Sequence, residues 1–241
     1  MVLDKVKGCI YYSDNRLDPI ILEACQKQLL KAFKGDIVSV TLKPMDFGKN
    51  IVVDLPRGYP TMVKQIVTAL ENLETETVFF TEHDVLYHPS HFEFTPQRAD
   101  MFYYNSNVWR WQYPLDRIIT YDTLKSLSGL CCNRELALRH YTSRMNKMVE
   151  KGWDLNYEGE SINARLWGYE PGTKPTKKGG FSDEEHRTWK SKFPIVDIRH
   201  GKTFTRSKTT KEEFKHIPAE DTWKETTLDR IEGWNLKELF K

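Results

Sequence analysis

Thr77–Asp84, which reads TVFFTEHD, is the stretch that decides the fold. Its first five residues predict a buried strand, and it ends abruptly in Glu82, His83 and Asp84. In open α/β sheets, ligands bind outside the carboxyl ends of the strands, so a site is expected directly after a buried strand. Acidic residues also end strands simply because loops are exposed, but two carboxylates delivered by a buried strand lose solvation unless a cation or donors face them. The stretch therefore favours a cation site at the end of a parallel strand.

Strands and helices alternate on both sides of this stretch, which indicates parallel strands joined by crossover helices. We expect strands at 8–12, 37–42 and 195–198 and helices at 18–33, 60–73, 133–151 and 161–167. Asp18 and Asn133 are the expected helix caps. Residues 43–59 hold two Pro and two Gly and predict a long loop. Residues 100–111 and 117–122 predict a second, more antiparallel group of strands that is rich in aromatic residues.

The composition is that of one ordinary globular domain. The chain has 241 residues, is 39% hydrophobic and carries a formal net charge of +2, which excludes disordered, collagenous and coiled-coil proteins. No window approaches the ~20 apolar residues of a membrane span. Four cysteines lie in apolar runs without a CxxC pair, so we expect reduced core thiols and a cytoplasmic protein: Cys9, Cys25, Cys131 and Cys132.

The order of these features resembles the nucleotide-binding half of GT-A glycosyltransferases: a strand that ends in Ser13-Asp14-Asn15, then a helix, a strand, a helix and the Glu82-His83-Asp84 motif. Ser128–Glu135 is similar to the small-residue turn and helix start of that family, and Glu158–Tyr169 to its acidic residue and helix. The resemblance implies an α/β fold with a single GT-A-like, Rossmann-like domain over 1–202 and a mostly parallel central sheet. Residues 1–99 would form the nucleotide-binding half, 100–202 the acceptor half, and 203–241 an irregular C-terminal arm packed on the same domain.

The resemblance also implies the site residues. Asp84 would hold Mn²⁺ or Mg²⁺ directly, Glu82 would bind the ribose or reach the metal through water, and His200 would be a third metal ligand. The catalytic base would be Glu160 or Glu170, with Glu158 a further candidate. The nucleotide-binding set joins residues after the first strand, in the long loop and around the acidic motif: Tyr12, Ser13, Asp14, Asn15, Lys49, Glu82, His83 and Gly129.

We therefore expect a metal-dependent glycosyltransferase that moves a sugar from a nucleotide diphosphate sugar, UDP being the commonest nucleotide in that family, to a hydroxyl acceptor such as a glycan or a modified nucleic-acid base. A nucleotidyltransferase of similar fold is one alternative, although such enzymes usually carry a glycine-rich loop after the first strand and 13–17 has no glycine.

A non-catalytic nucleic-acid-binding protein is the second alternative, because 199–215 holds six Lys or Arg against two Glu. The two ideas combine in a glycosyltransferase directed to DNA or RNA, which would need a basic face for phosphates; such a face could be formed by Lys174, Lys177, Lys178, Arg199, Lys202, Arg206 and Lys208. A zinc cluster of His83, Asp84, His88 and His91 is a weaker reading, because its spacing fits no common zinc site and Pro89 interrupts it.

Overall fold

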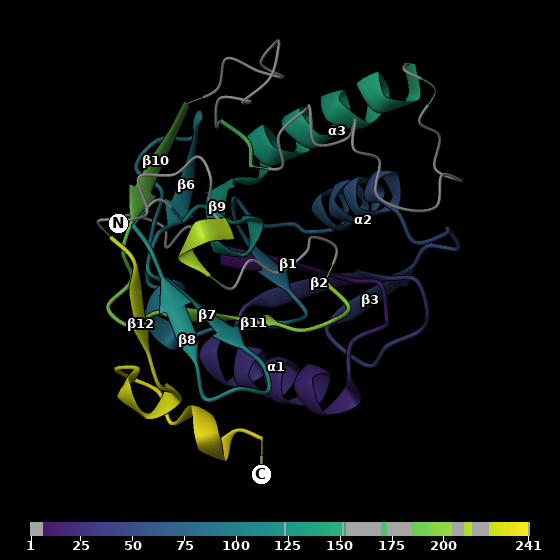
Figure 1. Cartoon of the computed structure of the whole chain (residues 1–241). Coiled ribbons are helices and arrows are strands. Elements are labelled where there is room, and N and C mark those ends of the chain that lie inside the picture. Colours follow the sequence, from purple (N-terminus) through teal and green to yellow (C-terminus); the bar gives the residue numbers. More distant parts are fainter. Residues whose placement is uncertain are drawn as a thin grey trace.

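The computed structural model describes residues 7–122, 124–150, 152, 170–172, 185–203, 210–213 and 222–240. Within these ranges the chain forms two β-sheets and three α-helices (Figure 1). The helices are α1 (Pro19–Ala32), α2 (Tyr59–Glu71) and α3 (Arg134–Glu150). Short 3₁₀ helices cover Pro89–His91, Leu127–Gly129, Lys211–Glu213, Leu228–Arg230 and Leu236–Glu238. No helix in the described ranges combines the length and the apolar character needed to cross a bilayer.

The central sheet has seven strands in the order β10-β6-β9-β4-β1-β2-β3. Strands β1 (Lys7–Ser13), β2 (Asp36–Thr41), β3 (Lys49–Val52) and β4 (Thr77–Glu82) are parallel. β9 (Leu130–Asn133) runs antiparallel to β4 and to β6 (Met101–Asn105), which pairs in parallel with β10 (Glu185–Trp189). The expected α/β fold with a mostly parallel central sheet is confirmed.

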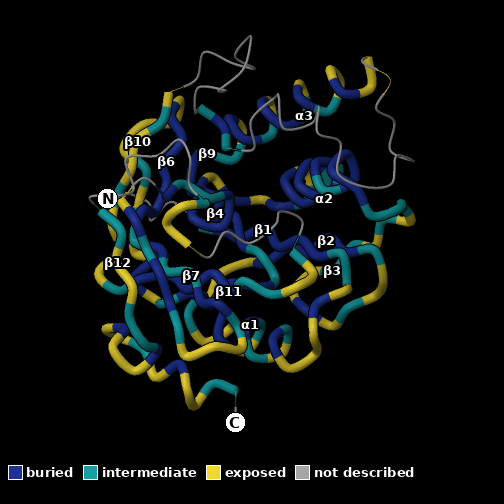
Figure 2. The backbone as a smooth tube through the Cα atoms, viewed as in Figure 1, coloured by how far each residue is buried: buried dark blue, intermediate teal, exposed yellow. Residues whose placement is uncertain are grey.

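Both faces of the central sheet are covered, which explains the continuous apolar strands. Ile10, Val38 and Phe80 pack against α2 and α3 on one face. Cys9 and Phe79 belong to a second cluster on the other face, together with Leu29 of α1. Figure 2 shows the five inner strands of this sheet as mostly buried, whereas the edge strands β3 and β10 are intermediate to exposed.

The second sheet has five strands in the order β12-β8-β7-β11-β5: Lys224–Thr226, Ile118–Thr120, Val108–Gln112, Ile195–Arg199 and Val85–Leu86. All pairings are antiparallel except β7 with β11. Trp109 and Trp111 pack from β7 into the cluster that contains Ile21 and Cys25 of α1. Because side chains alternate along a strand, Arg110 points to the opposite face of this sheet.

The helix caps and the state of the cysteines, which were predicted from local sequence, are confirmed. Asp18 caps α1 by accepting from the amide of Ile20 at 2.9 Å. Asn133 caps α3 by accepting from Glu135 N at 3.0 Å and Leu136 N at 3.2 Å. The four cysteines are free and buried, as expected.

Several element assignments need correction. The expected loop at 43–59 contains β3, whose pairing with β2 the local turn residues do not reveal. The stretch 100–111 is not one group, because β6 joins the central sheet and only β7 joins the second. The expected turn and helix start at 128–135 contains β9, and β10 was not expected at all. The expected helix at 161–167 lies outside the described residues.

Candidate active site

A cavity of about 210 Å³ lies where the carboxyl ends of β1 and β4 meet the second sheet. Its position agrees with the expectation that ligands bind at this edge of a parallel sheet. The cavity is rich in charged groups of both signs. It is lined by Tyr12, Ser13, Asp14, Arg57, Met62, Gln65, Glu82, His83, Asp84, Arg110, Ser126, Leu127, Glu170, Asp197, Arg199, Lys202 and Thr203.

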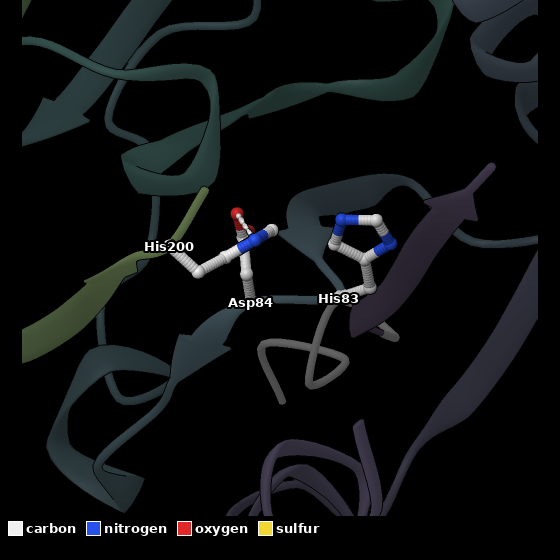
Figure 3. Close-up of side chains that lie close together, drawn as sticks. All are labelled: His83, Asp84 and His200. Atoms are coloured by element: carbon white, nitrogen blue, oxygen red, sulfur yellow. Dashed lines mark hydrogen bonds and ion pairs between the residues drawn. The ribbon is translucent and has the colours of Figure 1, made fainter. Parts of the chain in front are cut away.

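Three potential metal ligands lie close together, and two of them, His83 and Asp84, line this cavity. One ligand atom each of His83, Asp84 and His200 lies within 4.8 Å of the others (Figure 3). His200 Nε2 lies 3.3 Å from Asp84 Oδ2, and His83 Nδ1 lies 2.7 Å from the hydroxyl of Ser13. The expected metal residues Asp84 and His200 are therefore neighbours although 116 positions separate them.

Strand pairing explains this convergence. Asp84 directly precedes β5, and β5 pairs with β11 so that Val85 lies opposite Asp197. The amide of Ile198 donates to the carbonyl of Asp84 at 2.9 Å. The end of β11 therefore lies against the turn after β4, and His200 follows that end directly.

Asp84 and Glu82 are driven in opposite directions by their surroundings. Burial alone would raise the pKa of Asp84, but the hydrogen bond with His200 and nearby positive charge outweigh it, so this pKa is lowered. Burial and the charge of Asp84 raise the pKa of Glu82 to about 8. Glu82 Oε1 accepts a 2.6 Å hydrogen bond from the hydroxyl of Tyr12. Glu82, an expected metal residue, is thus absent from the described three-residue cluster and bears a proton near neutral pH.

The donor set fits a divalent transition metal. Imidazole ligands suit Zn²⁺ and Fe²⁺ best, and Mn²⁺, as a transition metal, accepts a set of two imidazoles and one carboxylate more readily than Mg²⁺, which prefers oxygen ligands. His200 Nδ1 accepts from the amide of Lys202 at 3.2 Å, so the neutral ring carries its proton on Nε2 and donates to Asp84. A cation bound at Nε2 would displace this proton, so His200 must change tautomer if it is a ligand.

Of the two expected nucleotide-binding residues directly after β1, Asp14 lines the cavity and Asn15 does not. Asp14 lines the cavity and pairs with Arg57, whose Nε lies 2.6 Å from Asp14 Oδ2. Asn15 is not among the lining residues, and its side chain instead accepts from the amides of Leu42 and Lys43 at 2.8 and 3.0 Å. Its φ of 56° is in the left-handed region, which asparagine tolerates. Within the described ranges, Asn15 thus ties the β1 loop to the end of β2.

Two other expected nucleotide-binding residues do not line the cavity. Lys49 borders a separate hollow with Gly35, Asp36 and Glu74, near the amino ends of the strands. Gly129 is buried, and a Cβ there would lie 2.9 Å from the carbonyl oxygen of Asn105. A glycine is therefore required at 129 by the close approach of two backbones.

The expected catalytic bases are only partly described. Glu170 lines the cavity, whereas Glu158 and Glu160 lie outside the described residues. Gln65 and Asp197 line the cavity but were not expected in the site. A signal for Asp197 was available, since it is the one charged residue inside the apolar run Ile195–Ile198.

The histidine-rich zinc cluster is not formed by the described side chains. His88 caps a 3₁₀ helix by accepting from the amide of Ser90 at 3.2 Å. His91 is fully buried, and burial lowers its pKa to about 3. Only His83 and Asp84 of that set belong to the metal cluster.

One residue of the expected basic face, Arg199, is largely buried and does not lie on an exposed basic surface. The side chain of Arg199 is only 13% exposed and pairs inside the cavity with Asp197. Lys202 lines the same cavity, and Lys174, Lys177, Lys178, Arg206 and Lys208 lie outside the described residues.

The chain is similar in its course to two solved structures. One is mannose-1-phosphate geranyltransferase from Thermus thermophilus, with 11% identity, a TM-score of 0.43, and coverage of 80% of this chain and 76% of that chain. The other is inositol-1-phosphate CTP transferase from T. maritima, with 12% identity, a TM-score of 0.35, and coverage of 65% and 78%. No model of a known family matches the sequence, and no curated protein sequence matches it. Function is therefore argued from the residues of the site.

Proposed function

We propose that this protein is a metal-dependent glycosyltransferase that uses a nucleotide diphosphate sugar, with UDP the first nucleotide to test, and a hydroxyl acceptor. The observation that carries the proposal is the cluster of His83, Asp84 and His200, of which His83 and Asp84 line a cavity at the carboxyl ends of β1 and β4. A divalent cation held there would neutralise the charge that develops on a leaving nucleoside diphosphate. The lowered pKa of Asp84 supports its assignment as the anionic ligand.

The remaining walls supply the other requirements of such a reaction. Tyr12, Ser13 and the Asp14–Arg57 ion pair border the cavity at the end of β1, where the nucleoside would lie. An acceptor hydroxyl is a poor nucleophile at neutral pH, so an inverting transfer needs a carboxylate base. Glu170 lines the cavity and is our first candidate for this base, and Glu160 remains the second. A glycan or a modified nucleic-acid base is the proposed class of acceptor.

A thermal-unfolding assay with UDP tests the metal-bridged nucleotide. UDP should raise the melting temperature appreciably only when Mn²⁺ is present, because the diphosphate and Asp84 repel each other without a cation. A ligand at about 100 times its dissociation constant adds about 2.7 kcal/mol of stability. Because of the two imidazoles, Mn²⁺ should act at lower concentration than Mg²⁺.

Two variants make this assay specific. Asp84→Asn should lose the Mn²⁺-dependent stabilisation, whereas Asp36→Asn, an exposed residue at the start of β2, should keep it. Equal stabilisation by UDP with and without metal would contradict the proposal. Product analysis separates the alternative, because a nucleotidyltransferase releases pyrophosphate from a nucleoside triphosphate and a glycosyltransferase releases the nucleoside diphosphate.

A further inference from the structure

The second sheet contributes a charged wall to the cavity. Arg110 of β7 and Asp197 of β11 are cross-strand partners, and Arg199 lies two residues further along β11 on the same face. All three side chains line the cavity. Their exposed fractions, in the order Arg110, Asp197 and Arg199, are only 19%, 8% and 13%. Charged side chains buried to this extent lose most of their hydration, so their arrangement requires an explanation.

The ion pairs within this wall are long. Arg110 Nε lies 3.4 Å from Asp197 Oδ2, and Arg199 Nη1 lies 3.4 Å from each carboxylate oxygen of Asp197. Good charge-assisted hydrogen bonds are about 2.7–2.9 Å long. One carboxylate is thus shared by two guanidinium groups, neither of which it contacts at the optimal distance. The three side chains together carry one excess positive charge.

The guanidinium group of Arg110 is held in place, but not all of its N–H groups make hydrogen bonds. Its Nη1 donates to the hydroxyl of Tyr121 at 3.1 Å, and its guanidinium carbon lies 5.7 Å from the centre of that ring. Its Nε is buried and, within the described part of the chain, makes no hydrogen bond, because its 3.4 Å contact with Asp197 is an ion pair without hydrogen-bond geometry. An oriented guanidinium whose buried Nε–H makes no hydrogen bond at a cavity wall has the properties of an anion site.

We propose that Arg110 and Arg199 form a phosphate-binding site and that Asp197 is a positioning residue for the two guanidinium groups. Guanidinium forks match the oxygen geometry of a phosphate. The assignment of this phosphate to a substrate rests on the proposed function. Two sources share the chemistry: the distal phosphate of the donor diphosphate and a phosphate group on the acceptor.

The site itself is tested by calorimetric titration of the metal-free, full-length chain with inorganic phosphate. Arg110→Gln should weaken binding by about 10-fold or more, since a hydrogen bond to a charged group is worth at least that factor. Arg110→Lys should lie between the two, because it keeps the charge and loses the fork. The matched control is Arg117→Gln, a residue just before β8 of the same sheet, whose partner Glu225 lies 2.7 Å away and which does not line the cavity.

Absence of phosphate binding in the wild type, or equal binding by wild type and Arg110→Gln, would overturn the proposal. If Arg110→Gln fails to fold in a thermal scan, Arg110→Lys provides the comparison. Wild-type affinity of Arg110→Lys for inorganic phosphate would then overturn the proposal. The titration with inorganic phosphate contains no metal and no nucleotide. Asp84→Asn should still bind inorganic phosphate in this titration, so failure of the phosphate site is distinguishable from failure of the proposed function.

The two sources are separated by titration with UMP and UDP in the presence of Mn²⁺. If the wall binds the distal donor phosphate, Arg110→Gln should lose affinity for UDP but not for UMP. If it binds a phosphate on the acceptor, the variant should bind both nucleotides normally and lose only the binding of inorganic phosphate to the complex with Mn²⁺ and UDP. Either result supports the phosphate site and names its substrate.

Discussion

Replacing Glu82 with glutamine is expected to stabilise the metal-free protein at mildly alkaline pH. The pKa of Glu82 is raised from 4.5 to about 8 by burial and by the charge of Asp84. A carboxyl group whose pKa is higher in the folded state than in the unfolded state lowers the free energy of unfolding at high pH, because the unfolded chain loses the proton first. This destabilisation is absent below about pH 4.5, grows between about pH 4.5 and pH 8, and is constant above pH 8.

The structure sets the size of this effect. Each pH unit in the window is worth about 1.4 kcal/mol, so the upper limit near pH 8 is about 5 kcal/mol. Glu82 is half-buried, so solvent screens part of this cost, and we expect glutamine to recover about 2 kcal/mol. For a chain of this length that corresponds to a rise of roughly 4–8 °C in melting temperature. The amide oxygen of glutamine can still accept the hydrogen bond from Tyr12.

The assay is thermal unfolding in a metal chelator at several pH values between about 5 and 8. The gain of Glu82→Gln over wild type should shrink to under about 1 kcal/mol near pH 5. Glu71→Gln is the control, because Glu71 is exposed on α2, and surface changes of this kind usually stay within about 0.5 kcal/mol. A gain that is the same at both ends of the pH range would refute the assignment of a proton to Glu82.

Three further outcomes are expected. Tyr12→Phe should extend the pH dependence of stability to higher pH, because the hydrogen bond from Tyr12 lowers the pKa of Glu82; the same pH series measures it, and an unchanged window counts against the coupling. His200→Ala should raise the Mn²⁺ concentration needed for half-maximal stabilisation by UDP, and wild-type affinity should weaken at acidic pH because a protonated imidazole cannot ligate; superimposable metal titrations would remove His200 from the site. Gly129→Ala should destabilise the protein by about 1–3 kcal/mol because its Cβ would lie 2.9 Å from the Asn105 carbonyl, whereas Gly201→Ala meets no atom within 4 Å; equal melting temperatures of the two variants would contradict the close approach.

The parts of the fold that depend on local chemistry could be predicted from the sequence. The caps at Asp18 and Asn133 act over two or three residues, and the apolar run of β4 needs only its own composition. β3 and β10 could not be predicted, because their strand conformation depends on distant partners that the local sequence does not name. The same reason separates the two halves of 100–111, which enter different sheets.

The same limit applies to the site: candidate residues could be predicted from the sequence, but the contacts between them could not. Asp84 follows a recognisable buried strand, and His200 follows another, so both could be named as candidates. Their contact depends on the pairing of the two-residue strand β5 with β11, for which the sequence carries no visible signal. The role of Glu82 was also hidden, since its hydrogen bond comes from Tyr12, 70 positions away.

The opposite pKa directions of Glu82 and Asp84 bear on how a metal site would attract its substrate. Paired titratable groups whose surroundings push their pKa values apart have separate tasks. In the metal-free site, with Asp84 ionised and Glu82 protonated, these two carboxyl groups together carry one negative charge. Ionisation of Glu82 would add a second negative charge and increase the repulsion of a diphosphate. The hydrogen bond from Tyr12 lowers the pKa of Glu82, so burial must outweigh it to keep the proton in place. In the metal-free site the carboxyl of Glu82 therefore adds no negative charge, and Asp84 is the ionised carboxylate that the proposed function needs as a cation ligand.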